Sequence, residues 1–374
     1  MKQFVRGLFW AAVWAPGALA APYVPKDEAT VLERLPLRRS DPVAAELRKL
    51  RGAALARRYF ELAMAQGDPR YVGYAEAALR DAHDDPPAEV LFVRGLLKQY
   101  RHDFSGALLD LEAALKHDPE LIGARSWRAA IFMVGADYAA AREECRGLEP
   151  LASELIATGC RAAVDGATGK ARAAYDALKA ALDGRKDAGP ESRLWVLTRL
   201  AELAERLEQP ATAERHFRDA LALGVRDDFL LAAYADFLLE QGRPKEIDAL
   251  VRKWGHSDNL DLRLTLAAKA LALPEAQKRA QALSARFAAA ALRGERLHLG
   301  EEARFLLELK GDAKGALDAA VENWKSQREP RDAKVLLEAA LAVGDRKAAA
   351  PVLRWLGQSG LEDARLRRLA AKLK

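Results

Sequence analysis

The chain has 374 residues, of which 50% are hydrophobic and 30% are charged, so its composition is that of a folded protein. Lysine and arginine number 59 and aspartate and glutamate 54, and the charges are interspersed, which argues against a nucleic-acid-binding groove. Two cysteines are too few for a disulfide-dense small scaffold or a four-thiolate zinc site. The length suits two or three ordinary domains or one long repeat array.

The first twenty residues have the pattern of a secretory signal peptide. Lys2 and Arg6 precede an apolar run that Pro16-Gly17 ends, and Ala18-Leu19-Ala20 provides the small residues that signal peptidase requires. We therefore expect residues 1–20 to be removed by a cut after Ala20, leaving a soluble periplasmic or secreted protein. An uncleaved anchor is the alternative, but the apolar run is shorter than the roughly 20 residues that cross a membrane.

Residues 21–41 form a proline-marked lead, which we expect to be extended. Beyond it the chain is rich in alanine, leucine, glutamate, lysine and arginine, which favour helices, and no alternating strand pattern persists. Turn signals recur between the apolar-periodic stretches, which predicts short helical hairpins. These signals are Gly67-Asp68-Pro69, His102-Asp103, Gly135-Ala136-Asp137, Asp165-Gly166, Gln209-Pro210, Gly242-Arg243-Pro244, Leu273-Pro274, Gly311-Asp312 and Gly344-Asp345.

A repeated unit is clearest from Ala88 to Leu121. Small, large and closing residues follow one another in it at fixed spacing, namely Gly95, Ala107, Leu111, Ala114 and Pro119. This order resembles the tetratricopeptide repeat. Six such units start 32, 34, 30, 42 and 34 residues apart, close to the family period of about 34; the starts are Ala63, Gly95, Ala129, Gly159, Ala201 and Ala235.

The resemblance implies an all-α fold, a right-handed superhelical solenoid of tetratricopeptide-like helical hairpins. We expect the array over residues 42–360 and a C-terminal capping helix over 361–374. A single hairpin cannot bury its own apolar stripe, so each hairpin must be covered by the next. Such a stack is expected to leave a concave inner face free for a ligand.

First-helix positions on the inner face commonly hold an extended peptide or a partner's helix in this family. The residues that we expect to bind a partner are therefore Phe92, Leu96, Tyr100, Trp127, Trp195, Arg199 and Arg206. The same register places Met133, Thr198, Glu202, Asp236 and Glu240 on first helices. Ordinary packing between repeats, or a solvated helix face, is the alternative for each. The clamp for a terminal carboxylate that cytosolic chaperone-binding members carry is not matched in this sequence.

The two cysteines fall on consecutive repeats. Cys145 is expected on the second helix of one repeat and Cys160 on the first helix of the next, with the turn around Pro150 between them. A disulfide is geometrically possible there and export makes it chemically reasonable, so we predict a bridge between Cys145 and Cys160. Two separate buried thiols are the alternative.

The sequence holds no convincing catalytic or metal-binding constellation. Its nearest approach to a metal cluster, Asp81, His83, Asp84 and Asp85, is better explained as a solvated helix end. We predict a non-catalytic protein-interaction scaffold of the cell envelope, monomeric on its own, without cofactor, metal or nucleic acid, and accessory to an export or outer-membrane assembly machine. The alternative is an enzyme acting on glycan through groove carboxylates such as Glu202, Glu205 and Asp236.

Overall fold

The computed structural model describes residues 25, 27 and 30 and the ranges 42–80, 85–185, 187–255, 257–292 and 298–373. The predicted signal peptide and nearly all of the lead lie outside the described residues, as do Asp81, His83 and Asp84. The described part of the chain is helical and contains no strand, which confirms the predicted all-α class.

The helices are short and are joined by turns. They are α1 (Pro42–Leu47), α2 (Gly52–Gln66), α3 (Arg70–Ala78), α4 (Ala88–Tyr100), α5 (Phe104–His117), α6 (Ile122–Val134), α7 (Tyr138–Leu148), α8 (Glu154–Ala167), α9 (Ala171–Gly184), α10 (Pro190–Arg206), α11 (Pro210–Ala222), α12 (Asp228–Glu240), α13 (Lys245–Trp254), α14 (Asp258–Ala270), α15 (Ala276–Leu292), α16 (Leu299–Phe305), the π-helical turn η1 (Leu306–Lys310), α17 (Ala313–Trp324), α18 (Pro330–Val343), α19 (Arg346–Ser359) and α20 (Ala364–Ala371).

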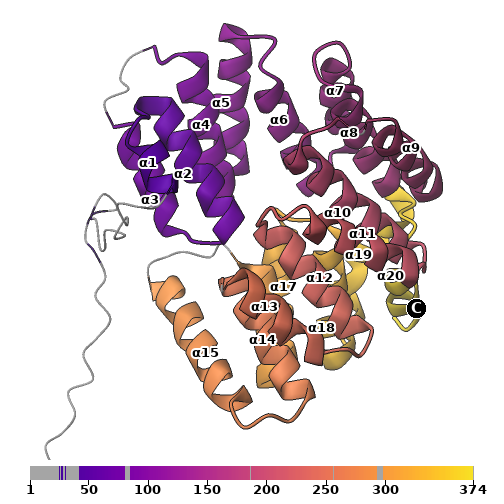
Figure 1. Ribbon diagram of the computed structural model, residues 1–374. Helices are drawn as coiled ribbons and strands as arrows, with labels where there is room; N and C mark the ends of the chain where they lie inside the picture. Colours follow the sequence, from indigo (N-terminus) through magenta and orange to yellow (C-terminus); the bar gives the residue numbers. More distant parts are fainter. Residues whose placement is uncertain are drawn as a thin grey trace, which may run out of the picture.

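From α2 onward the helices pair into consecutive hairpins. Each even-numbered helix up to α18 packs against the odd-numbered helix that follows it. Even-numbered helices also contact the next even-numbered helix along the chain, and α11 packs against α12 as well. The hairpins therefore stack in sequence order (Figure 1), which confirms the predicted array of tetratricopeptide-type hairpins. The right-handed sense of the superhelix stays a prediction.

The small residues of the repeat lie where its two helices touch. A Cβ atom placed on Gly95 of α4 would lie 2.7 Å from Cγ of Leu111 on α5, so only glycine allows this approach. Ala107, Leu111 and Ala114 on α5 are completely buried. The sequence spacing of the repeat is thus the spacing at which α4 and α5 pack.

Four of the nine predicted turns are closed by an aspartate that caps the next helix. The side chain of each accepts a hydrogen bond from a backbone N–H in the first turn, and these caps are Asp103, Asp137, Asp312 and Asp345. The predicted turn at Asp165-Gly166 is wrong, because both residues lie inside α8. A Cβ on Gly166 would be 2.8 Å from Cδ2 of Leu203, so this glycine marks a close approach of α10.

The C-terminal hairpins pack against the turn between α6 and α7. The indole Nε1 of Trp355 donates to the hydroxyl of Tyr138 at 2.9 Å, and the backbone N–H of Arg328 donates to the Val134 carbonyl at 2.8 Å. Figure 1 shows these C-terminal helices, in yellow, beside α10 to α12. The array therefore closes on itself, and the C-terminal hairpins bound its inner face together with the early ones.

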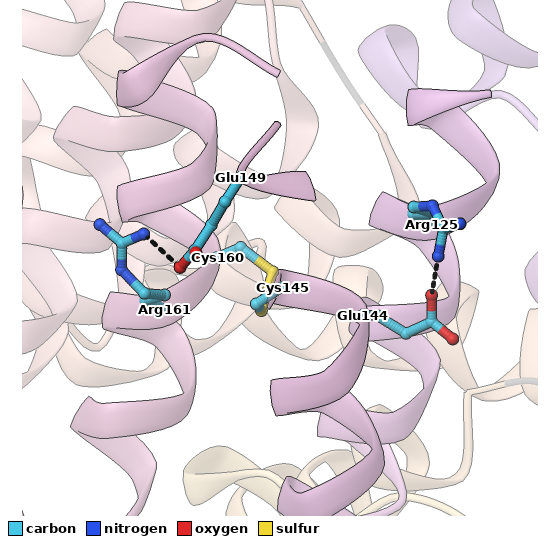
Figure 2. Close-up of a disulfide and its surroundings, with 6 residues drawn as sticks. All are labelled: Arg125, Glu144, Cys145, Glu149, Cys160 and Arg161. Atoms are coloured by element: carbon cyan, nitrogen blue, oxygen red, sulfur yellow. Dashed lines mark hydrogen bonds and ion pairs between the residues drawn. A yellow bond between two sulfur atoms is a disulfide. The ribbon is translucent and has the colours of Figure 1, made fainter. Parts of the chain in front are cut away.

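A disulfide joins Cys145 on α7 to Cys160 on α8 (Figure 2), with their Cα atoms 5.4 Å apart. The alternative of two separate thiols is thereby excluded. Beside the bridge, Arg161 of α8 donates to Glu149 at 2.7 Å. The disulfide thus ties the second helix of one repeat to the first helix of the next.

Replacing both cysteines by alanine should lower the free energy of unfolding by about 3 kcal/mol, the loop-closure effect for a bridge of this span. The bridge closes a loop of 15 residues, and alanine introduces no unpaired hydroxyl in the core. Urea unfolding at pH 7, followed by circular dichroism, measures the change. Wild-type protein treated with dithiothreitol is the matched control, and its stability should fall to that of the variant. Equal midpoints for oxidised and reduced protein would contradict the prediction.

Candidate functional site

A cavity of about 510 Å³ lies on the inner side of the array. Every even-numbered helix from α2 to α20 contributes to its wall, whereas few odd-numbered helices do. First helices therefore face inward, as the tetratricopeptide register predicts. One lining residue from each, in chain order, is Met64, Tyr100, Met133, Ala163, Glu202, Asp236, Arg263, Arg304, Lys334 and Arg365.

Charged side chains make up much of the cavity wall, and the acidic ones outnumber the basic ones. The acidic residues are Glu202, Glu205, Asp227, Asp228, Asp236, Glu240, Glu301, Glu308, Glu329, Asp332, Glu338 and Asp363. The basic residues are Arg199, Arg206, Arg263, Arg304, Arg328, Arg331, Lys334 and Arg365. Since buried charges are costly unless they are paired, the partners of these groups decide the electrostatics of the cavity.

Asp236 of α12 accepts hydrogen bonds from two guanidiniums. Arg263 donates from Nε and Nη2 to the two carboxylate oxygens at 3.0 and 2.7 Å, and Arg304 donates to Oδ1. Arg263 also reaches Glu301, with 2.9 Å between Nη1 and Oε1. Burial opposes ionisation of Asp236, but the two guanidiniums hold its pKa well below the usual range. The Asp236 carboxylate is therefore ionised, and both of its oxygens already accept hydrogen bonds from guanidiniums.

A second cluster joins the C-terminal helices to α10 and α12. Glu240 accepts from Lys334 Nζ at 2.6 Å and from Arg365 Nη1 at 2.7 Å, and these cations lower its pKa against the effect of burial. Arg365 Nη1 also lies 3.3 Å from Glu205. Burial raises the pKa of Glu205 to about 8, and neighbouring carboxylates add to the shift although Arg365 opposes it. Glu205 therefore retains its proton at neutral pH.

Phe229 of α12 lies between two arginines. The guanidinium carbons of Arg199 and Arg331 are 4.7 and 5.3 Å from the centre of its ring, a cation–π arrangement. Arg199 is paired with Glu202 at 3.0 Å, and Arg331 with Glu329 at 2.5 Å. The ring and the two ion pairs hold α10, α12 and α18 together at the cavity wall.

A hydrogen-bonded chain of polar groups closes another part of the wall. The Gln327 amide lies 3.2 Å from Nδ1 of His102 and donates to Asn323 at 3.0 Å, and Asn323 donates to Asp332 at 2.9 Å. Burial, followed by the neighbouring His298 and Arg331, lowers the pKa of His102 to about 4, so its imidazole is neutral at pH 7. Burial raises the pKa of Asp332 to about 7.

Three of the predicted partner-binding residues line the cavity: Tyr100, Arg199 and Arg206. Arg206 donates from Nη1 to the Gly166 carbonyl at 3.2 Å. Four further residues that the register placed on first helices also line it, namely Met133, Glu202, Asp236 and Glu240. The charged residues that the register placed on α10 and α12 therefore meet in the wall of one cavity.

The other four predicted residues, Phe92, Leu96, Trp127 and Trp195, pack between helices and are not part of the cavity wall. Phe92 and Leu96 are buried in the core. The Phe92 ring packs on Gly123 of α6 and the Trp195 ring on Gly159 of α8. Trp127 meets Phe60 edge-on, with ring centroids 5.8 Å apart. Their positions match the alternative of inter-repeat packing.

Sequence reasoning missed most of the basic residues that pair with these carboxylates. Arg263, Arg304, Arg331 and Lys334 lie on α14, α16 and α18, mostly where the repeat spacing is weakest and gives no register. Arg365 lies in the predicted capping helix, and its side chain turns inward to Glu240. The signal available in the sequence was a polar residue at an inward-facing position of a first helix. Such a position can be recognised only where the repeat spacing shows which helix faces point inward.

Two of the three carboxylates named for a glycan enzyme are held in ion pairs, and the third, Glu205, is protonated at neutral pH beside Arg365. Both oxygens of Asp236 accept from guanidiniums, and Glu202 is paired with Arg199. Within the part of the chain that the structure describes, no group of histidine, cysteine and acidic side chains has the arrangement of a metal site. None of the described helices combines the length and the apolar character that a membrane crossing requires. The non-catalytic role stays a prediction.

No family model matches the chain, and no curated protein matches it. Solved structures with some similarity include Pseudomonas aeruginosa PilF (20% identity, TM-score 0.39, covering 56% of this chain and 95% of that one). The APC/C hetero-tetramer Cut9–Hcn1 shares 14% identity (TM-score 0.35, 86% and 76%), and yeast Tom70 shares 12% (TM-score 0.29, 88% and 90%). With TM-scores this low, these similarities carry no argument about the fold. The architecture is instead defined by the stacked helical hairpins of this chain. The fold is of the tetratricopeptide type.

Replacing Glu205 by glutamine should stabilise the protein at pH 8 by at least about 1.4 kcal/mol, the equivalent of one pKa unit. The folded state keeps the Glu205 proton up to about pH 8, whereas the unfolded chain loses it near 4.5. This contribution to stability is therefore complete below about pH 4.5 and is lost as the pH rises through about 8. Glutamine mimics the protonated form at every pH, so the gain should appear between pH 5 and 8 in urea titrations.

The matched control is Glu240→Gln, for which the opposite sign is expected. Lys334 and Arg365 lower the pKa of Glu240, so its ionised form stabilises the fold at neutral pH. That variant should be less stable than wild type at pH 7, and the difference should shrink in acid. A Glu205→Gln variant with an unchanged pH profile would show that Glu205 titrates normally.

Proposed function

We propose that this chain is a protein-interaction scaffold that holds a segment of a partner protein in its central cavity. The observation that supports it most is the cavity wall itself, to which every even-numbered helix from α2 to α20 contributes. A wall built from all the first helices is preorganised by the whole array, which lowers the entropy cost of binding. Binding at this wall therefore needs no local folding of the scaffold.

The size of the cavity favours a short extended segment over a partner's helix. Its volume of about 510 Å³ lies within the range of pockets for small ligands, and so suits a few side chains. A helix with side chains is about 10–12 Å across and several turns long. To lie along the inner wall, such a helix would first have to displace the C-terminal hairpins that Trp355 and Arg328 hold in place.

We also propose that the scaffold works in the cell envelope, as an accessory of an export or outer-membrane assembly machine. Two features support export: the signal-peptide pattern of residues 1–20 and the disulfide between Cys145 and Cys160. Structural disulfides persist in oxidising compartments and are rare in the cytosol. The envelope role also follows what the tetratricopeptide resemblance implies.

Expression of the whole chain in a bacterial host should yield a mature protein that begins at Ala21 and is found in the periplasmic extract. Intact-mass measurement identifies the terminus. The matched control is Ala20→Arg, which removes the small residue at the cleavage site and should block processing. Recovery of a wild-type protein that still begins at Met1, in the cytosolic fraction, would contradict the export proposal.

A photoreactive residue at position 100 should capture the partner in cells that naturally make this protein. Tyr100 lines the cavity, so p-benzoylphenylalanine in its place should give a discrete covalent protein adduct on irradiation. Leu109 on the second helix of the same hairpin is 69% exposed and lies outside the cavity, which makes it the matched control. Absence of an adduct at position 100, or the same adduct at both positions, would contradict binding in the cavity.

A further inference from the structure

The basic side chains of the cavity already have partners. Guanidiniums or ammonium groups are paired with carboxylates in Arg199–Glu202, Arg263–Asp236, Arg304–Glu308, Arg331–Glu329, Lys334–Glu240 and Arg365–Glu240. The remaining two, Arg206 and Arg328, donate to backbone carbonyls. The cavity therefore has little free positive charge to offer a ligand.

Several carboxylates of the cavity lack a cation. Asp227, Asp228, Asp332 and Glu338 make no ion pair with any residue that the structure describes. Asp227 caps α12 and Asp332 is hydrogen-bonded to Asn323. That leaves Asp228 and Glu338 as the carboxylates with capacity for a ligand.

Asp228 is the stronger candidate for ligand binding because it is buried and only one of its two carboxylate oxygens accepts a hydrogen bond. Its side chain is 3% exposed at the start of α12, where the ends of α2 and α14 meet it. Oδ2 accepts from the Asn259 amide at 2.8 Å, and Oδ1 has no hydrogen-bond partner among the described residues. A buried carboxylate oxygen without a donor is costly, and a cationic donor from a ligand would relieve that cost.

Resting on the proposed function, we propose that the cavity recognises a lysine-bearing extended segment of the partner, with Asp228 as the acceptor for the lysine ammonium. One free oxygen suits a compact ammonium better than a guanidinium, which prefers both oxygens of a carboxylate. Met64 lines the same cavity on α2, whose C-cap Gly67 lies against Asp228, and offers apolar contact to the lysine stem. Glu338 is the second acceptor within the cavity.

Isothermal titration with a blocked pentapeptide, alanine and lysine alternating, tests the proposal on the full chain. The lysine peptide should bind, and its acetyl-lysine counterpart should bind at least about tenfold more weakly because the charged hydrogen bond is lost. Asp228→Asn should weaken the lysine peptide by a similar factor. Asp248→Asn is the matched control, since Asp248 is exposed on α13, paired with Arg252 and outside the cavity, and it should leave the affinity unchanged.

Circular dichroism and thermal unfolding show whether Asp228→Asn remains folded, and Glu338→Gln provides a second variant if it does not. Equal affinity for both peptides, or no effect of either variant, would overturn lysine recognition. Tighter binding of spermidine than of the peptide would instead assign the cavity to a free polyamine. If the position-100 adduct still forms while the lysine peptide fails, only this inference is lost; if both fail, the proposed function is lost as well.

Discussion

The architecture depends on one constraint, which is that a pair of short helices cannot cover its own apolar stripe. Each hairpin is therefore buried by its neighbour, and close approach requires a small residue such as Gly95 where the helices cross. The first helices consequently share one side of the stack. Their inward positions take no part in contacts within a hairpin, so they are free to carry charge, as Glu202 and Asp236 do.

Because the array closes on itself, the charged side chains of the inner wall are partly buried and need partners. Hydrogen bonds such as that between Trp355 and Tyr138 hold the last hairpins against the α6–α7 hairpin, so the inner wall is partly withdrawn from water. Buried carboxylates then need partners. Asp236 and Glu240 have them in arginines and a lysine, whereas Glu205 shares one arginine with other carboxylates and keeps its proton instead. The result is a largely neutralised cavity with an acidic remainder.

The aromatic residues show why packing positions and binding positions cannot be told apart in a repeat sequence alone. Phe92 and Trp195 lie on first helices, where a partner-binding role is reasonable, yet their rings pack on Gly123 and Gly159 of the neighbouring first helices. A large ring facing a glycine on the adjacent helix is a packing device. The relevant partner lies 31 or 36 residues away, so the distinction is visible only once the repeats are aligned in space.

The helical class, the hairpin repeat and the plausible pairing of Cys145 with Cys160 could be predicted from the amino-acid sequence, because each depends on residues within about one repeat of each other. The sequence also placed Tyr100, Arg199 and Arg206 on the inward register. The ion pair of Arg365 with Glu240 and the contact of the last hairpins with the α6–α7 hairpin could be seen only in the folded structure. Those contacts depend on the total rotation over many hairpins. The rotation from one hairpin to the next varies slightly, the repeat spacing does not record this variation, and it adds up along the stack.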